Sequence, residues 1–280
     1  MDPMEPTDHL ARLDIFSSEA AAFDKAVRRA AGSGREAPLV PSCPGWSVAD
    51  LAGHLGSVQR YLTHILRERL TEPCDPTAPE LYALPADPAV RAAWPVPDRT
   101  PHRGPVPEEL FDWSAAAARD LVAVLRELGP DVPVWTWSPD GDRTSGFWIR
   151  VQTIEQAVHR WDAQAVTGHP DAFAPALAVD AVTQTVEVMA PARRGWKQAP
   201  PGTGERYRFR RTDAPGTWTV EFDGDEVRFD RRDTAPVHVE AAGTASDLML
   251  FLWGRLPAEQ LHVTGDGALM EHWFTLVPPA

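Results

Sequence analysis

The sequence predicts an α+β protein of two domains, a helical domain over residues 1–192 and a small α+β domain over residues 203–280. In the first part, apolar residues recur at helical spacing through several long segments. The stretch APARRGWKQAPPGTGE, rich in Pro and Gly, breaks this pattern near residues 192–205. Beyond it, short segments of alternating apolar and polar residues indicate strands joined by tight turns, which favours an antiparallel-rich sheet.

Four long helices and a shorter fifth helix are expected in the first domain. Their predicted ranges are 8–31, 47–70, 107–128, 147–167 and 174–190. Ser47 is a good N-cap for the second helix, and Asp50 follows it at the spacing of a capping box. Pro107 suits the first turn of the third helix, and Gly129 suits the position just beyond its end.

Two stretches between these helices lack a regular pattern. Residues 71–106 are rich in proline, and a loop of this length inside a compact domain is usually functional or an insertion specific to the family. Before the fourth helix, Asp140 and Gly141 predict the turn of a short hairpin or an extended loop.

The second domain is expected to contain five strands and two helices. The predicted order is four strands (RYRFRR, TWTVEF, EVRFD, VHVEAA), a helix (ASDLMLFLWGRL), a strand (QLHVTGD) and a final helix (ALMEHWFTLV). The DGD at 223–225 supplies a hairpin turn. The alternation of Arg with aromatic residues in RYRFRR at 206–211 could mark a basic patch for nucleic acid, but a strand with one solvated face explains it more simply.

The charge balance restricts the class of partner. With 27 basic and 40 acidic residues the net charge is −13, so we expect no nucleic-acid partner. No apolar run approaches the about 18 residues of a membrane span, and the acidic N-terminus MDPMEPTDHL lacks the apolar core of a secretory signal. We therefore expect a cytoplasmic monomer that acts on small molecules. The preference for Arg over Lys, with abundant Ala and Pro, suggests a GC-rich bacterial genome.

The two cysteines, Cys43 and Cys74, form neither a CxxC pair nor a disulfide framework. Neither has a histidine beside it in the sequence to mark a nucleophile, so we expect both thiols to be inert. Any thiol chemistry would then need a thiol from outside the protein.

His54 is a polar residue on the apolar side of the second predicted helix. Leu51, Val58 and Tyr61 share that side at helical spacing. A buried imidazole must satisfy both ring nitrogens. A single histidine in this position is more often a hydrogen-bonded core residue than a metal ligand.

The fourth predicted helix carries a second polar feature. Gln152, Glu155, His159 and Asp162 form a seam beside the apolar stripe. The i, i+4 spacing lets the side chains of Glu155 and His159 converge on one ion, although a boundary pair worth a few tenths of a kcal/mol would look the same. For Asp162, a carboxylate that supports a ligand and an exposed charge are equally good interpretations.

Taken together, His54, Glu155 and His159 suggest a metal site. A helical bundle can build such a site from side chains on facing helices. Two His and one carboxylate are the ligands of a catalytic zinc with its fourth position open. Non-haem iron uses the same residue types, so the ligands alone do not identify the metal.

Three motifs then resemble one family. VPSCPGWSVADLAGHLG at 40–56 resembles a hallmark of the mycothiol-dependent maleylpyruvate isomerase family, which is part of the DinB-like superfamily of metal-binding four-helix bundles. TIEQAVHRWDA at 153–163 is similar to its second hallmark, and GTASDLMLFLWGRL with VTGDG at 243–267 is similar to its C-terminal domain. The resemblance covers nearly the whole chain and is weakest at 71–106. It implies a DinB-like four-helix bundle followed by the C-terminal domain of the family.

The resemblance also implies roles for particular residues. The ligands of the family match His54, Glu155 and His159, which would hold a divalent metal, usually zinc, and mycothiol, a sugar-linked cysteine thiol, would bind there. An arginine near the end of the C-terminal domain takes part in catalysis in the family. Arg255 in WGRL is the nearest match, and an exposed arginine at a helix end is the alternative.

The function that follows is addition of a metal-bound thiolate to an electrophilic small molecule, because coordination stabilises the thiolate. An isomerase and a thiol S-transferase both need this step, so the choice between them stays open. A metal-dependent hydrolase that uses metal-bound water is an alternative enzyme. A non-catalytic bundle that binds a metal or a small molecule is the third interpretation.

Overall fold

The computed structural model describes residues 9–32, 34, 36–139, 141–231 and 235–279. They form two compact units, and each is described by itself. The first contains Met1–Trp137 and Gly141–Asp171, and the second contains Ser138–Asp140 and Ala172–Ala280. The predicted α+β class is confirmed, because a helical region precedes a region with a five-stranded sheet.

The predicted boundary between the domains differs from the one observed. The sequence placed it between residues 192 and 203, whereas the two units divide at Asp171–Ala172. The fifth predicted helix therefore belongs with the sheet and not with the bundle. The Pro and Gly residues between the two predicted domains suggested a linker. In the structure, Pro191 and Gly195 lie within a helix that extends to Lys197, and Gly202 and Gly204 lie in the first strand of the sheet.

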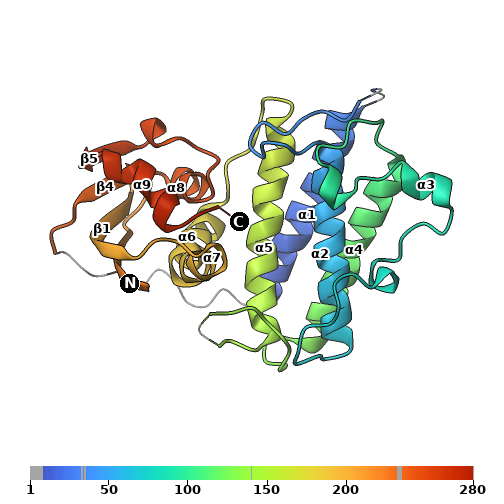
Figure 1. Cartoon of the computed structure of the whole chain (residues 1–280), viewed down its shortest axis with the longest axis horizontal. Helices are drawn as coiled ribbons and strands as arrows, with labels where there is room; N and C mark the ends of the chain where they lie inside the picture. Colours follow the sequence, from blue (N-terminus) through green and yellow to red (C-terminus); the bar gives the residue numbers. More distant parts are fainter. Residues whose placement is uncertain (1–8, 33, 35, 140, 232–234, 280) are drawn as a thin grey trace. The chain divides into compact units, whose positions relative to one another are not determined.

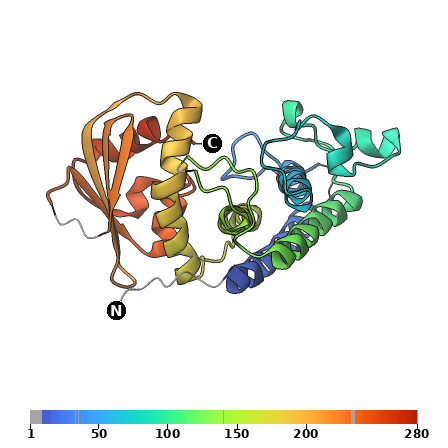
Figure 2. The ribbon, with the colours of Figure 1, turned by 90° about the horizontal axis from the view of Figure 1, so that it is seen from below.

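The first unit is a bundle of four long helices. Figure 1 shows them side by side, and Figure 2 looks nearly along α2 and α5. Helix α1 packs mainly against α5, and α2 packs mainly against α4. The helices are close to their predicted ranges: α1 (His9–Ala31), α2 (Val48–Arg67), α4 (Glu108–Leu128) and α5 (Ser145–Ala165).

The contact between α2 and α4 depends on a glycine. A Cβ atom placed on Gly56 would lie 2.0 Å from the Trp113 ring, so only glycine allows this approach. The Trp113 indole N–H donates to the Tyr82 carbonyl at 2.8 Å, and the Trp94 ring packs against it at 5.2 Å between centroids. Tyr82 and Trp94 come from the proline-rich segment, which therefore packs on the bundle.

The proline-rich segment 71–106 contains only short helical pieces. They are Pro79–Tyr82, α3 (Pro88–Ala92) and Pro97–Arg99. Near its end, the His102 backbone N–H donates to Asp50 at 2.9 Å. The segment is thus fixed to the start of α2 as well as to Trp113. The shorter irregular stretch before α5 pairs Pro133 with Thr144, as a short hairpin requires, although Asp140 of its predicted turn lies outside the described residues.

The second unit is a five-stranded sheet with helices. Its strands occur in the order β3-β2-β1-β4-β5, and only the β1–β4 pair is parallel. The elements in chain order are α6 (Pro175–Gln184), a π-helical turn (Thr185–Met189), α7 (Ala190–Lys197), β1 (Gly202–Arg211), β2 (Thr217–Gly224), β3 (Glu226–Asp230), β4 (Val239–Gly243), α8 (Ala245–Leu252), a short helical turn (Ala258–Gln260), β5 (His262–Gly265) and α9 (Ala268–Leu276).

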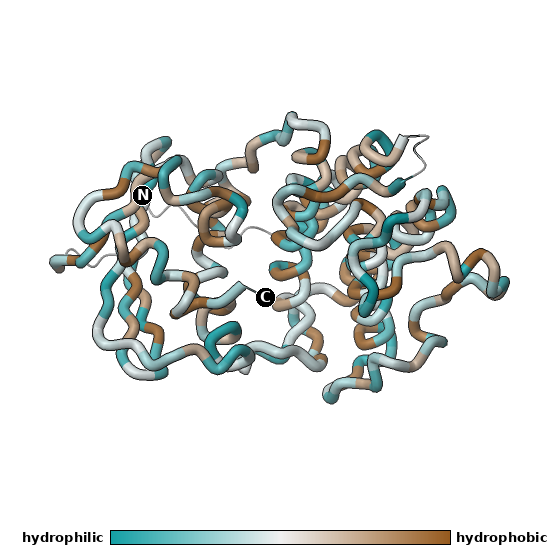
Figure 3. Tube along the Cα trace, turned by 45° about the horizontal axis from the view of Figure 1, so that its top comes forward, coloured by the Kyte–Doolittle hydropathy of each residue, from teal (hydrophilic) through white to brown (hydrophobic). Residues whose placement is uncertain are grey.

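The two faces of this sheet differ in polarity, and the alternation along the chain can be followed in Figure 3. Tyr207 and Phe209 of β1 are fully buried against Trp273 of α9, with ring centroids 5.2 and 5.0 Å apart. On the other face, Arg210 pairs with Glu240 at 2.7 Å, and neighbouring arginines pair similarly. The interpretation of RYRFRR as a strand with one solvated face is confirmed. None of the helices within the described ranges is long and apolar enough to cross a membrane.

Candidate metal centre

A tight turn leads into α2. The Val40 N–H donates to the Trp46 carbonyl at 2.9 Å, and the Trp46 N–H donates to the Cys43 carbonyl at 3.0 Å. The turn needs a left-handed residue, which Gly45 provides with φ +84°. The predicted capping box follows directly: the Ser47 hydroxyl accepts from the Asp50 N–H, and the Asp50 carboxylate accepts from the Ser47 N–H. This turn fixes the residue at which α2 begins, and therefore the position of His54 along the length of the bundle.

The structure brings together the three residues that the sequence singled out. His54 lies on α2, and Glu155 and His159 lie one turn apart on α5. One possible ligand atom from each lies within 4.8 Å of the others. The His54 Nε2 is 3.1 Å from the Glu155 Oε1, and the two imidazole rings are 5.2 Å apart between centroids.

These residues fit a tetrahedral metal ion by their chemistry and their spacing. Two imidazole nitrogens and a carboxylate oxygen suit zinc or another borderline divalent ion. At usual zinc bond lengths, two ligand atoms of a tetrahedral ion are separated by about 3.3 Å. The 3.1 Å between His54 and Glu155 is close to that value.

A buried carboxylate supports His159 from behind. Asp162 is fully buried, and its Oδ2 lies 2.9 Å from the His159 Nδ1. An ionised carboxylate can only accept, so Nδ1 carries the proton and Nε2 keeps a lone pair for a ligand. The interpretation of Asp162 as an exposed charge is therefore wrong, and its contact with His159 matches the supporting role.

Asp162 also connects the turn before α2 to α5. Its Oδ1 accepts from the Ser42 hydroxyl at 2.6 Å, and its Oδ2 lies 3.2 Å from the Cys43 sulfur. Cys43, His159 and Asp162 form a second group whose possible ligand atoms converge within 4.8 Å. Sequence spacing could not indicate this group, because Ser42 and Cys43 lie about 120 residues before Asp162. Only the fold brings them together.

Glu155 is held in its ionised form. Burial raises its pKa, but the hydrogen bond with His54, the electrostatic interactions with the His54 and His159 imidazoles, and a hydrogen bond from Gln152 lower it, and the net shift is downward. The Gln152 amide donates to the Glu155 Oε2 at 2.6 Å. Both carboxylate oxygens therefore have a partner, which fixes the orientation of Glu155.

An aromatic side chain borders the three residues. The Trp46 ring lies 5.0 Å from that of His54 and stacks on that of His159 at 6.2 Å, between centroids. The side chain of His159 is only 8% exposed, whereas those of His54 and Glu155 are 30% and 19% exposed. The indole therefore covers one side of the cluster, and His54 provides its more open side.

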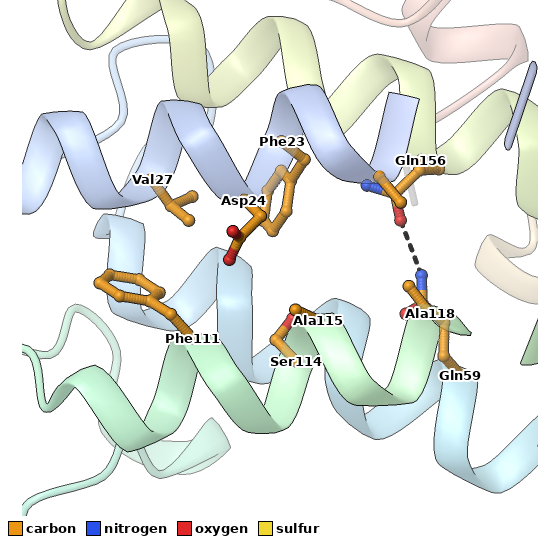
Figure 4. A pocket seen from close by; sticks show the side chains of 10 residues that line it. Phe23, Asp24, Val27, Gln59, Phe111, Ser114, Ala115, Ala118 and Gln156 are labelled. Carbon is orange, nitrogen blue, oxygen red and sulfur yellow. Dashed lines mark hydrogen bonds between the residues drawn. The ribbon is translucent and has the colours of Figure 1, made fainter. Parts of the chain in front are cut away.

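A second polar contact holds the same two helices together. The Gln59 amide of α2 donates to the Gln156 side chain of α5 at 2.8 Å, and both residues are 1% exposed (Figure 4). Gln156 directly follows Glu155, and Gln59 lies just over one turn after His54. This buried amide pair fixes the register of α2 against α5, on which the distance from His54 to Glu155 depends.

Arg255, the other residue that the resemblance singled out, lies in the second unit. It follows α8 and is partly buried, and its Nη1 donates to the Trp253 carbonyl at 2.7 Å. It is therefore not a fully exposed arginine at a helix end.

Comparison with known proteins identifies the family. Residues 16–164 match the model of the mycothiol maleylpyruvate isomerase N-terminal domain, and residues 176–272 match that of the corresponding C-terminal domain. A crystal structure of the mycothiol-dependent maleylpyruvate isomerase is similar in fold, with a TM-score of 0.55 at 13% identity over 91% of this chain and 92% of the other. The crystal structure of a histidine-to-alanine mutant of that enzyme gives a TM-score of 0.56 at 12% identity, over the same shares of the two chains.

No protein with curated annotation matches the sequence significantly. The match to the N-terminal domain model alone covers more than half of the chain, and the C-terminal model covers most of the remainder in the expected order. This chain belongs to the mycothiol maleylpyruvate isomerase family of enzymes.

Proposed function

We propose that this protein is a metal-dependent enzyme that uses mycothiol to attack an electrophilic small molecule, as an isomerase or as a thiol S-transferase. The observation that carries the proposal is the convergence of His54, Glu155 and His159 within 4.8 Å. Family membership supplies the thiol, because the similar solved structures are those of a mycothiol-dependent maleylpyruvate isomerase.

The residues of this chain would prepare the site in three ways. Asp162 holds the His159 proton on Nδ1, which leaves Nε2 available as a ligand atom. The lowered pKa of Glu155 keeps its carboxylate ionised at neutral pH. Trp46 covers one side of both imidazoles and so limits the approach of water.

A divalent metal held by these three side chains would supply positive charge that favours the thiolate over the thiol. Two neutral imidazoles and one carboxylate leave a site of this kind with a net charge of about +1. The open side at His54 gives the thiol an approach to the site. Because no cysteine belongs to this group of three, the nucleophilic sulfur would come from the external thiol.

We retain Arg255 as the candidate for the catalytic arginine of the family, supported by its position in WGRL directly after α8. A guanidinium binds a carboxylate through two parallel hydrogen bonds, so its role would be to hold an acidic substrate.

Metal analysis tests the site. Wild-type protein, a His54→Ala variant and a His64→Ala control on the same helix are purified in parallel, and their metal content is measured. We expect about one metal per chain in the wild type and the control, as for a three-ligand zinc site, and little in His54→Ala. No metal in any of the three would refute the metal centre.

Thiol dependence tests the reaction. Turnover of maleylpyruvate and of other activated alkenes is measured with mycothiol, with another low-molecular-weight thiol and without thiol. We expect turnover only with a thiol, and the products distinguish isomerisation from stable thiol transfer. Turnover that persists without any thiol would favour metal-activated water and a hydrolase.

A further inference from the structure

Cys43, His159 and Asp162 form a second group of possible metal ligands beside the candidate metal centre. One ligand atom from each lies within 4.8 Å of the others. His159 and Asp162 are 7% and 0% exposed, and Cys43 is half-buried. The Asp162 Oδ2 lies 3.2 Å from the Cys43 sulfur and 2.9 Å from the His159 Nδ1. A thiol, an imidazole and a carboxylate therefore converge on one point in the interior of the first unit.

The local structure holds these groups in position. The Cys43 N–H and carbonyl are both hydrogen-bonded within the turn before α2, which fixes the residue that carries the sulfur. The Ser42 hydroxyl donates to the Asp162 Oδ1 at 2.6 Å, so the other oxygen of this carboxylate is the one directed at the thiol and the imidazole. Ligands that are positioned before an ion arrives reduce the cost of ordering them on binding.

The second group differs from the first in its donor atoms. Thiolate, imidazole and carboxylate all serve as zinc ligands, and a thiolate favours softer metal ions. Cys43 and Asp162 would provide two anionic ligands, which together cancel the charge of a divalent ion. A neutral complex suits a buried site, because an uncompensated charge is costly there. The second group is therefore suited to a thiophilic divalent ion such as cadmium.

The two groups share His159. A neutral imidazole has one nitrogen without a proton, so it holds one ion. At the first centre that nitrogen would be Nε2, with the Nδ1 proton directed at Asp162. At the second group Nδ1 would bind the ion, the imidazole proton would move to Nε2, and the thiol proton would pass to solvent. An ion in one group therefore excludes an ion from the other.

We propose that Cys43, His159 and Asp162 form a binding site for a thiophilic divalent ion, which withholds His159 from the centre with His54 and Glu155. The site uses only the second group of ligands, so it does not depend on whether the first centre holds a metal. One consequence rests on the proposed function: thiophilic ions would inhibit the enzyme, because they remove a ligand of its metal.

Cadmium tests the site through its bond to sulfur. Metal-free protein is titrated with cadmium chloride, and the ultraviolet absorption of the cadmium–thiolate bond is followed. The chain has two cysteines, so a Cys74→Ser variant leaves Cys43 as its one thiol. We expect absorption that saturates at about one ion per chain in the wild type and in Cys74→Ser, and none in Cys43→Ser. No saturable absorption in Cys74→Ser overturns the site, whether or not Cys43→Ser folds.

The sharing of His159 is tested separately. His159→Gln should weaken cadmium binding at least about tenfold, since loss of a ligand costs no less than loss of the group that supports one. His54→Ala should keep the cadmium–thiolate absorption, because it alters the first centre alone. Unchanged binding in His159→Gln, or loss of the absorption in His54→Ala, refutes the assignment of ligands.

Wild-type protein supplied with zinc and cadmium together should hold about one ion per chain, because one imidazole serves both groups. Two ions per chain overturn the exclusion. The sulfur signal also keeps this site apart from the proposed function. A first centre that binds no metal would leave the absorption unchanged, and a missing absorption would leave metal binding by His54 and Glu155 untouched.

Discussion

Replacement of Asp162 by asparagine tests whether this carboxylate supports a metal ligand or only makes buried hydrogen bonds. The carboxylate accepts from Ser42 on one oxygen and from His159 and Cys43 on the other. An asparagine has the same shape but only one acceptor oxygen. Whichever way its amide points, the NH2 group faces a donor. If it faces His159, the imidazole moves its proton to Nε2, where a metal would bind.

The expected magnitude follows from these contacts. Loss of a carboxylate that supports a metal-bound histidine lowers metal affinity by about 10–100-fold, or about 1.4–2.8 kcal/mol. Removal of a hydrogen bond to a charged group costs about 1.5–3 kcal/mol of folding stability. Because at least one contact survives in either amide orientation, we expect the metal-free variant to lose about 2–4 kcal/mol.

Two measurements keep these effects apart. Zinc affinity is determined by competition with a chelator, and the stability of the metal-free protein is determined by urea unfolding. The control is Asp112→Asn, an exposed aspartate that pairs with the partly buried Arg28. It should change zinc affinity by less than twofold, within the scatter of such measurements. If Asp162→Asn binds zinc as the wild type does, the assignment of His159 as a ligand supported by Asp162 is wrong.

Three further substitutions and one matched control test the packing and the electrostatics. Gly56→Ala should destabilise the bundle by at least about 1–3 kcal/mol in urea unfolding, because its Cβ would overlap the indole on α4. Gly195→Ala is the matched control: its Cβ meets nothing within 4 Å on α7, so we expect about 0.5–1 kcal/mol of stabilisation. Arg194→Met should lower stability by about 2–4 kcal/mol, because the Arg194 guanidinium donates to the carbonyls of Leu276, Pro200 and Gly224, and an unchanged midpoint would contradict this structural role. The hydrogen bond from Arg211 lowers the pKa of Asp213, so its stabilising contribution is present above the unfolded value near 3.8 and is lost as the pH falls below it. Asp213→Asn should therefore flatten the acid limb of the stability curve.

Local signals in the sequence were sufficient to predict most of the helices and strands. The Ser47–Asp50 capping box involves residues three apart, and the predicted contacts occur. The predicted DGD turn joins β2 to β3, with Gly224 in the left-handed region at φ +59°. These features depend on neighbouring residues, so sequence spacing alone identified them.

The end of the fifth predicted helix could not be identified in this way. The predicted range 174–190 ends just before Pro191, and proline lacks an N–H and crowds the preceding turn. In the structure the chain widens into a π-helical turn at Thr185–Met189, and the helix then continues to Lys197. The wider turn accommodates the proline without ending the helix. The continued helix also buries side chains in the second unit, because both arginines of α7 are buried.

The candidate site was predictable only in its outline. The spacing of Glu155 and His159 placed them on one face of a helix, but their contact with His54 depends on the packing of α2 against α5. That packing is fixed elsewhere, by the Gln59–Gln156 amide pair and by the contacts of Asp162 with the turn before α2. These contacts involve none of the atoms that a metal would use.

It follows that the bundle itself positions the three residues, and that a metal would not have to assemble them. Removal of a bound metal should therefore leave α2 and α5 in the same register, with His54 and Glu155 joined by their direct 3.1 Å contact. Asp162 is the residue that couples this register to the chemistry, because the same carboxylate anchors the turn that carries Trp46 and orients His159. A substitution there should affect the fold and the site together. A substitution of His54 on the more open side should affect only the site.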